Sequence, residues 1–255
     1  MQLPGVAGQF PNYASYASAT FEDVLPPKRR KDARTLCSER FVSSYLENLG
    51  DGEFRVRPLP VEAQFAPVFG MNTGDYNGDG LLDVLLVGNS FAPPPSTGRY
   101  DALIGALLRG DGEGGFEAVD VRRSGFSVEG DAKGLVEIAL SDGRRLLVVS
   151  RNDGRLKAFA TSPTGQRWFA AKPDDAYALI PRPGGHVEKR EFRYGHTYLS
   201  HSSRGVYVGA ATDTITVVDY QGHRRTVSLQ EATAENAVDA RTTGAAPPQK
   251  SSSRP

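Results

Sequence analysis

The residues best placed for chemistry form the nine-residue run 75–83, DYNGDGLLD, in which oxygen-bearing side chains recur at every second position before a final carboxylate. Hard cations such as Ca²⁺ take about six to eight oxygen ligands. Side chains at the first, third and fifth positions of a tight loop converge on one point, and Gly80 permits the sharp turn. Three carboxylates this close would repel one another without a cation. The predicted ligands of a Ca²⁺ ion are Asp75, Asn77, Asp79, Asp83 and the backbone carbonyl of Leu81.

The same spacing opens the calcium loop of an EF-hand, which is the natural alternative. An EF-hand loop carries a bidentate glutamate at its twelfth position and lies between two helices. The twelfth position here is Leu86, and the run 84–87 is aliphatic, which predicts a buried strand. We therefore expect a Ca²⁺ loop between two strands, where the ion acts as a structural clip.

The elements that would position this loop are short strands joined by turns. The chain of 255 residues contains 28 glycines and 17 prolines, which favours many turns over long helices. A Gly-Asp-Gly turn that leads into a phenylalanine occurs twice, with Asp51 and Asp111 60 positions apart. A second landmark, Gly-Asp ahead of an aliphatic segment, places Asp75 and Asp131 56 positions apart. These spacings predict a repeat of about 56–60 residues with three or four strands, the size of a propeller blade.

Segments rich in aliphatic and β-branched residues predict the individual strands. The expected strands are 41–48, 84–87, 103–108, 144–150 and 155–160, and alternation at 187–193, 197–200, 205–209 and 214–219 predicts a further β unit. Near the N-terminus, Thr20 and the acidic residues after it predict a short helix that ends before Pro26. Ala33, Leu36 and Cys37 also have helical spacing.

Residues 65–89 resemble the FG-GAP or VCBS repeats of integrin-α-type propellers, through a Phe-Gly pair, the run DYNGDGLLD and an aliphatic strand. The resemblance implies Ca²⁺ binding at the residues already named. Residues 188–200 are similar to the ASPIC/UnbV module that often closes large bacterial VCBS-repeat proteins, so the resemblance extends over about 41–228. Members of the family form a closed ring of blades, whereas two repeats are found here. The chain is therefore expected to be a fragment whose partners include the missing blades.

The resulting prediction is an all-β fold, a partial or small β-propeller of FG-GAP/VCBS blades with a short N-terminal helical segment and a disordered C-terminal tail. The expected divisions are an N-terminal segment at 1–40, the blades at 41–165, an ASPIC/UnbV-like β unit at 166–228 and the tail at 229–255.

Two further positions bear on metal binding. In the second repeat Lys133 stands where the first repeat has Asn77, so we expect no metal there. His196 and His201 are five positions apart on an expected strand, where side chains alternate between faces. The two imidazoles should therefore point to opposite faces, which disfavours a transition-metal site.

Charge and cysteine content exclude several function classes. The 30 basic and 30 acidic residues cancel, so no general attraction to nucleic acid or anionic membranes is expected, and the basic run 28–31 is interpreted as a solvated turn. The single cysteine, Cys37, excludes an intrachain disulfide. No apolar run approaches the roughly 20 residues of a transmembrane helix.

The start of the chain shows no signal peptide. Because a weak Ca²⁺ site fills only outside the cytoplasm, we nevertheless expect an extracellular or cell-surface protein whose signal is missing here.

The sequence favours a non-catalytic binding module over an enzyme. We expect blade loops to bind a glycan or a protein, and the best candidate loop is 91–101 with Arg99, Tyr100 and Asp101. Equally, Arg99 and Asp101 could simply pair within a passive connection. The alternative function is a propeller enzyme acting on polysaccharides, a lyase or hydrolase, with the same three residues and His196 as candidate groups. No nucleophile-and-base spacing supports it.

Overall fold

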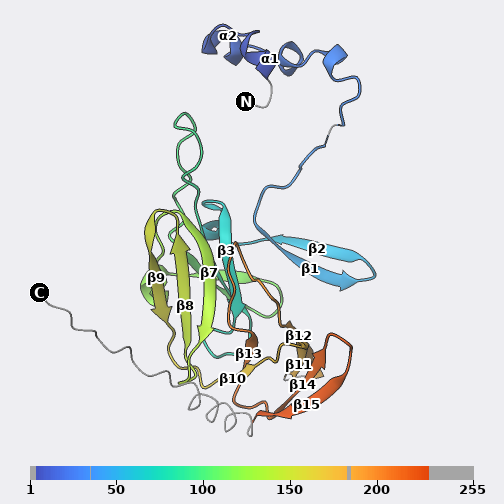
Figure 1. Cartoon of the computed structure of the whole chain (residues 1–255), viewed down its shortest axis with the longest axis vertical. Helices are drawn as coiled ribbons and strands as arrows, with labels where there is room; N and C mark the ends of the chain where they lie inside the picture. Colours follow the sequence, from blue (N-terminus) through green and yellow to red (C-terminus); the bar gives the residue numbers. More distant parts are fainter. Residues whose placement is uncertain (1–3, 35, 183–184, 230–255) are drawn as a thin grey trace, which may run out of the picture. The chain divides into compact units, whose positions relative to one another are not determined.

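The structure is a computed structural model in which residues 4–34, 36–182 and 185–229 are described (Figure 1). The chain divides into two compact units, Met1–Phe41 and Val42–Pro255. The predicted disordered tail at 229–255 lies outside the described residues, apart from Leu229. Leu229 is buried in a hydrophobic core of the second unit.

The first unit contains short helices: α1 (Pro4–Ala7), α2 (Tyr13–Ala17), α3 (Phe21–Val24) and a 3₁₀ turn, η1 (Pro27–Arg29). The prediction of a helix after Thr20 is confirmed, and Thr20 and Asp23 form a reciprocal capping box at the start of α3. The helical spacing of Ala33, Leu36 and Cys37 was misleading, because the described residues at 33–37 form no helix. Leu36 is 75% exposed, so an apolar face would have nothing to pack against. No described helix is long and apolar enough to cross a membrane.

The second unit is built from antiparallel sheets, which confirms the prediction of a mostly β fold. The first three are a hairpin of β1 (Ser44–Gly50) and β2 (Glu53–Pro58), a four-stranded sheet of β3 (Val68–Gly74), β4 (Asp83–Gly88), β5 (Ala106–Gly110) and β6 (Phe116–Val119), and a three-stranded sheet of β7 (Ala132–Ala139), β8 (Arg145–Arg151) and β9 (Gly154–Ala160). Short helical turns, η2 (Val61–Gln64) and α4 (Val121–Ser124), lie in the connections.

The remaining strands form two sheets whose members alternate along the sequence. They are β10 (Arg167–Ala170) paired with β13 (Gly205–Val208), and a sheet in the order β12 (Val187–Glu191), β11 (Asp175–Pro181), β14 (Thr214–Asp219) and β15 (Arg224–Ser228). Because β10 pairs across the chain with β13, the up-and-down order of the earlier sheets does not continue. The described strands therefore form no propeller ring.

Both Gly-Asp-Gly turns are hairpins, as predicted. Asp51 and Gly52 adopt positive φ between β1 and β2. Between β5 and β6, Oδ1 of Asp111 accepts hydrogen bonds from the backbone N–H groups of Glu113 and Gly115. The two turns share the Gly-Asp-Gly sequence but differ in geometry, since Asp51 itself adopts positive φ whereas Asp111 caps its turn with its side chain.

The second landmark of the predicted repeat has no structural counterpart. Asp75 follows β3 and lies in the connection to β4, whereas Asp131 precedes β7, the first strand of its sheet. The connection that corresponds to the 75–82 loop is the short turn between β7 and β8. The spacing of 56 residues was therefore coincidental, because a Gly-Asp pair marks turns of more than one kind.

Strand β4 is buried along its whole length because both of its faces are covered. Leu85 and Val87 pack with Leu135 of β7 and Val149 of β8. On the opposite face, Val84 and Leu86 pack with Ala63, Leu103 and Leu108. The continuous aliphatic run of this strand reflects these two contacts. The loop that precedes β4 is thus attached to the best-packed strand of its sheet.

A buried guanidinium connects the sheets. The side chain of Arg145, the first residue of β8, is 5% exposed and forms an ion pair with Glu137 of β7 at 3.4 Å. It donates a hydrogen bond to Oε1 of Gln166 and lies over the rings of Tyr76 and Tyr207, 5.0 and 4.1 Å from their centroids. Burial raises the pKa of Glu137, while Arg145 and the Tyr76 hydroxyl lower it. Removing the arginine would leave this carboxyl buried without a cation.

Replacing Arg145 with methionine should lower the free energy of unfolding by about 3 kcal/mol, because one member of a buried ion pair is lost. Arg145→Lys should have an intermediate effect, since an ammonium lacks the flat, forked guanidinium. Denaturant unfolding followed by the fluorescence of Trp168, the single tryptophan, measures both variants. The matched control is Arg144→Met, whose exposed side chain pairs with Asp142 and should matter little. Equal effects of the Arg144 and Arg145 variants would contradict the assignment.

Candidate functional site

The predicted calcium loop is held at both ends by the β3–β4 ladder. Gly74 pairs with Asp83 in the antiparallel register, so the two ends of the loop lie side by side. Asp75 and Asp83 are both buried, whereas Leu81 and Asp79 are exposed. The ladder therefore fixes one carboxylate at each end of the loop.

The loop is folded around the side chain of Asp75. Its Oδ1 accepts a hydrogen bond from Gly78 N at 2.6 Å, and its Oδ2 accepts from Gly80 N at 2.9 Å. Gly78 and Gly80 have φ of 84° and 87°, a region that glycine enters without strain. The two glycines therefore allow the backbone to wrap around one carboxylate.

The middle of the loop hydrogen-bonds to itself. Oδ1 of Asn77 accepts from Asp79 N, and Oδ1 of Asp79 accepts from Leu81 N. Nδ2 of Asn77 donates to Oδ2 of Asp79 at 2.7 Å. These are the short-range turn contacts expected of Asn and Asp in tight loops.

The carboxylates of the loop influence one another. Burial raises the pKa of Asp83, with smaller raising contributions from Asp79 and Asp75. Backbone N–H groups of Tyr76 and Gly110 donate to Asp83 and oppose the shift. Among the ion pairs of the described residues, none involves these three aspartates, so none of them has a direct cationic partner within the protein.

The donor types fit a hard cation, since the predicted ligands are all oxygen and include uncompensated carboxylates. In the described residues, however, no group of three or more His, Cys, Asp or Glu side chains is arranged to hold a metal ion. The loop oxygens instead accept hydrogen bonds from the loop itself. Calcium binding by Asp75, Asn77, Asp79, Asp83 and Leu81 therefore stays a prediction.

At Asp131 an internal cation is present. Nζ of Lys133 lies 2.6 Å from Oδ1 of Asp131 and donates to the carbonyl of Asn89 at 2.9 Å. The ammonium also lies 3.7 Å from the centroid of the Phe69 ring. The ammonium of Lys133 therefore provides the cationic partner of Asp131.

The predicted ligand loop at 91–101 is closed by a single β-bridge and contains one contact between a cation and an aromatic ring. Tyr100 pairs with Ser90 in an isolated β-bridge, and its side chain is 47% exposed. Arg99 lies over the ring of Phe91, 4.7 Å from its centroid. The ion pairs of the described residues do not include Arg99 with Asp101, so the passive pairing is not formed. No arrangement of Arg99, Tyr100 and Asp101 around a common point is apparent.

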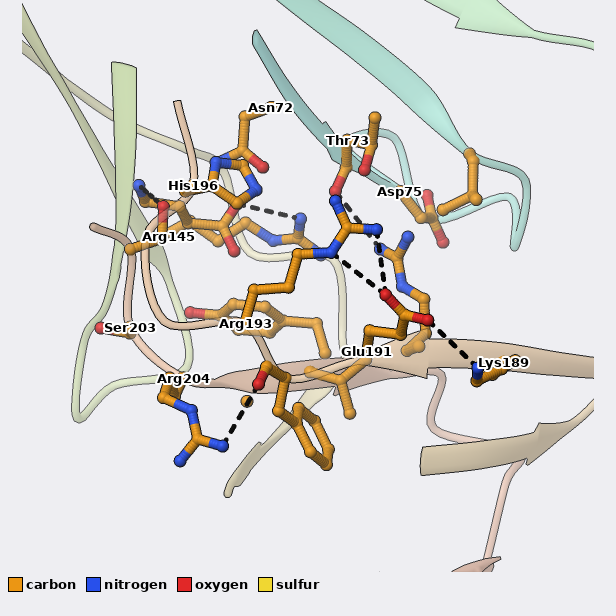
Figure 2. A pocket seen from close by; sticks show the side chains of 18 of the residues that line it. Asn72, Thr73, Asp75, Arg145, Lys189, Glu191, Arg193, His196, Ser203 and Arg204 are labelled. Carbon is orange, nitrogen blue, oxygen red and sulfur yellow. Dashed lines mark hydrogen bonds and ion pairs between the residues drawn. The ribbon is translucent and has the colours of Figure 1, made fainter. Parts of the chain in front are cut away.

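A polar pocket of about 340 Å³ lies next to the predicted calcium loop, and the sequence did not predict it (Figure 2). Asp75 contributes to its wall. The cationic side chains that line it are Arg145, Arg182, Lys189, Arg190, Arg193 and Arg204, and the carboxylates are Asp75, Glu137 and Glu191. The lining thus has an excess of three positive charges in a chain whose formal net charge is zero.

Hydrogen bonds connect the loop to the pocket. Nε2 of Gln166 donates to Oδ2 of Asp75 at 2.6 Å, and Oε1 of Gln166 accepts from Arg145. On a second path, Arg190 of β12 donates to the carbonyl of Thr73 in β3 at 3.3 Å. The wall of the pocket and the loop are therefore parts of one network.

The two histidines lie in the same pocket, and their predicted placement on opposite faces of a strand was wrong. Residues 197–200 form a turn, in which His196 N donates to Ser200 O at 3.0 Å. Positive φ at Gly195 and Leu199 breaks the extended conformation. Nδ1 of His201 accepts from Gly195 N at 3.0 Å. Strand alternation does not apply here because the segment is not a strand.

The pKa of His196 is lowered by burial and by the cationic side chains around it. Burial lowers its pKa, and the nearby Arg193, His201 and Arg190 lower it further. The imidazole is therefore neutral at neutral pH, so it can both donate and accept a hydrogen bond.

No protein-family model matches the sequence, and a search of curated proteins finds no relative. The resemblance to FG-GAP/VCBS repeats therefore depends on the residues of the loop and its flanking strands.

The pocket residues could not be recognised by local spacing, because they come from four separate parts of the chain. These parts are 72–82, 137–145, 182–193 and 196–207. The dense basic run at 189–193 is the single local signal, and in the sequence it indicated strand alternation only.

Replacing Arg193 with glutamine should raise the pKa of His196, because a positive charge that opposes protonation of the imidazole is removed. The side chain of Arg193 is 68% exposed, so the fold should tolerate the change. An NMR titration of the four histidines measures it. The matched control is Arg109→Gln, which breaks a similar exposed pair with Glu117 outside the pocket and should leave His196 unchanged. A pKa of His196 that stays constant or falls in Arg193→Gln would refute the electrostatic assignment.

Proposed function

We propose that this chain is a non-catalytic, calcium-stabilised binding module of the FG-GAP/VCBS propeller type, from a surface or secreted protein, which binds a glycan or a protein partner. The observation that carries the proposal is the double role of Asp75. This carboxylate organises the predicted calcium loop and also lines the polar pocket. An ion in the loop would therefore fix one wall of a binding site.

The strand order and the packing of the sheets support the part of the proposal that describes them as propeller blades. The sheet β3–β6 has simple up-and-down order, as a propeller blade does, and one of its faces packs on the sheet β7–β9. The β1–β2 hairpin shares the Gly-Asp-Gly sequence of the turn between β5 and β6 and would be the second half of a further blade. Leu46 and Phe54 on this hairpin are 59% and 57% exposed, as expected for strands whose neighbours are not present.

Calcium would relieve the repulsion among the loop carboxylates. Asp75, Asp79 and Asp83 lie within a few residues of one another and lack cationic partners among the described residues. Ca²⁺ held by these side chains, by Asn77 and by the Leu81 carbonyl would supply the missing charge. Through Gln166 and Arg145 the ordered loop would then stabilise the pocket wall. A site of extracellular affinity, on the order of 10⁻⁴–10⁻³ M, fills outside the cytoplasm, which supports a surface or secreted location.

Thermal unfolding in about 2 mM Ca²⁺ should occur at a higher temperature than in excess chelator. Binding to the folded state at the affinity above stabilises it by about 0.6–1.8 kcal/mol, a shift of roughly 1–7 °C for a chain of this size. Asp79→Ala should abolish the shift, and because Asp79 is exposed, the variant should still fold. Asp51→Ala, in the exposed β1–β2 turn, is the control and should keep the shift. An equal response of wild type and Asp79→Ala would exclude the loop as the site.

The competing function is a polysaccharide lyase or hydrolase. Incubating the chain with a panel of neutral and acidic polysaccharides, in Ca²⁺ and in chelator, should give no new reducing ends or unsaturated products. Turnover of any member that is lost in a pocket variant such as His196→Ala would contradict the non-catalytic proposal.

A further inference from the structure

We propose that the pocket next to the calcium loop binds a carboxylate-bearing sugar, a hexuronate unit, through Arg204, Arg193 and Asn72. This inference specifies the ligand class of the proposed binding function and therefore rests on it. It is argued from the charge, the unpartnered donors and the size of the pocket.

The charge of the pocket favours an anion. Six cationic side chains line the pocket with three carboxylates, and Glu188, which is not in the lining, pairs with Arg182 and Arg190. A surplus of two positive charges therefore remains at the pocket, although the formal net charge of the whole chain is zero. Charge of one sign concentrated in a cleft raises the local concentration of the opposite ion. The lowered pKa of His196 is a second sign of this positive potential.

Arg204 has no carboxylate partner among the described residues. Its Nη1 donates to the carbonyl of Lys172 and the hydroxyl of Tyr194, and its Nη2 donates to the carbonyls of Asp175 and Phe192. Its Nε is buried and makes no hydrogen bond. The guanidinium is thus rigidly held, with its charge uncompensated and one donor unused. Because its four Nη hydrogens are used by protein acceptors, Arg204 can offer a ligand carboxylate its positive charge and one hydrogen bond, from Nε.

Asn72 provides a second unused donor. The residue is 5% exposed, it lines the pocket, and its Nδ2 has no hydrogen-bond partner. A buried unpaired donor costs about 1–3 kcal/mol, which a ligand oxygen would recover. Figure 2 shows Asn72 and Arg204 well separated across the pocket, so one ligand would have to span it to reach both.

The neutral groups suit sugar hydroxyls. Oγ of Ser202 accepts from Glu137 N at 3.0 Å, and Oγ of Ser203 accepts from Ala139 N at 3.2 Å. A hydroxyl that accepts one bond retains its own hydrogen for another partner. The neutral imidazole of His196 can donate or accept. These groups match a ligand that has several hydroxyls in addition to its charge.

The size and the carboxylates of the pocket argue against a simple inorganic anion. A volume of about 340 Å³ is in the range of pockets for small organic ligands. Asp75, Glu137 and Glu191 in the lining would repel a multiply charged phosphate but can accept hydrogen bonds from hydroxyls. A singly charged, polyhydroxylated ligand satisfies both conditions.

An NMR titration of the 255-residue chain with sodium glucuronate, in Ca²⁺ and in chelator, tests the proposal. Saturable shifts of the Asn72 side-chain amide and the His196 ring are expected, with glucose and inorganic phosphate at least tenfold weaker. Arg204→Gln should weaken glucuronate binding about tenfold or more, as expected when a charged hydrogen bond is lost. Because Arg204 also holds backbone carbonyls, the exposed Arg193→Gln serves as a second variant and should weaken binding about threefold. Arg109→Gln is the control and should bind normally.

The outcomes separate this inference from the proposed function. No glucuronate binding, equal binding of glucose or phosphate, or unchanged affinity in both pocket variants would overturn the hexuronate proposal. If calcium still stabilises the same samples, the calcium module stands and only the ligand assignment fails. If glucuronate binds as expected and calcium has no effect on stability, the pocket stands and the calcium proposal fails.

Discussion

The buried guanidinium of Arg145 is the interaction on which the arrangement of the sheets depends. It contacts Glu137 on β7, Gln166 before β10, Tyr207 on β13 and Tyr76 in the 75–83 loop. A charge inside a protein is tolerated only where partners surround it, so these contacts must form together. The two aromatic rings and the ion pair hold the three-stranded sheet, the 75–83 loop and the β10–β13 pair in fixed positions relative to one another. The pocket exists because these segments are held around this side chain.

Local chemistry was readable from the sequence wherever a few neighbouring residues determine the structure. The turns at Asp51 and Asp111 and the cap at Thr20 each depend on hydrogen bonds across a few positions. The wrong predictions concern longer distances or missing contacts. The helical spacing at 33–37 had no surface to pack on. The spacing of Asp75 and Asp131 compared turns of different kinds, and the later strands pair with strands that are distant in sequence. A propeller ring depends on such long-range pairing, which strand patterns alone do not determine.

The candidate site likewise has a part that the sequence predicts, the 75–83 loop, and a part that it does not, the pocket. The loop at 75–83 was visible because its glycines and carboxylates are adjacent in sequence, and its compact fold around Asp75 agrees with that pattern. The pocket was invisible because its arginines, serines and histidines converge from four segments. The two unused donors, on Asn72 and Arg204, depend on which groups surround them in the folded chain, and a sequence pattern does not determine this. The charge excess at the pocket was concealed by a net charge of zero for the whole chain.

The central claim of this account is that the calcium loop and the pocket form one unit through Asp75, Gln166 and Arg145. The most direct test is a Ca²⁺ titration of the chain followed by NMR at two places, the backbone amides of residues 75–83 and the imidazole of His196. The account predicts that both sets of resonances move with the same Ca²⁺ dependence, and that in Gln166→Ala the loop amides still respond while His196 does not. Loop amides that respond to Ca²⁺ with a silent His196 in the wild type, or no response at either place, would contradict it.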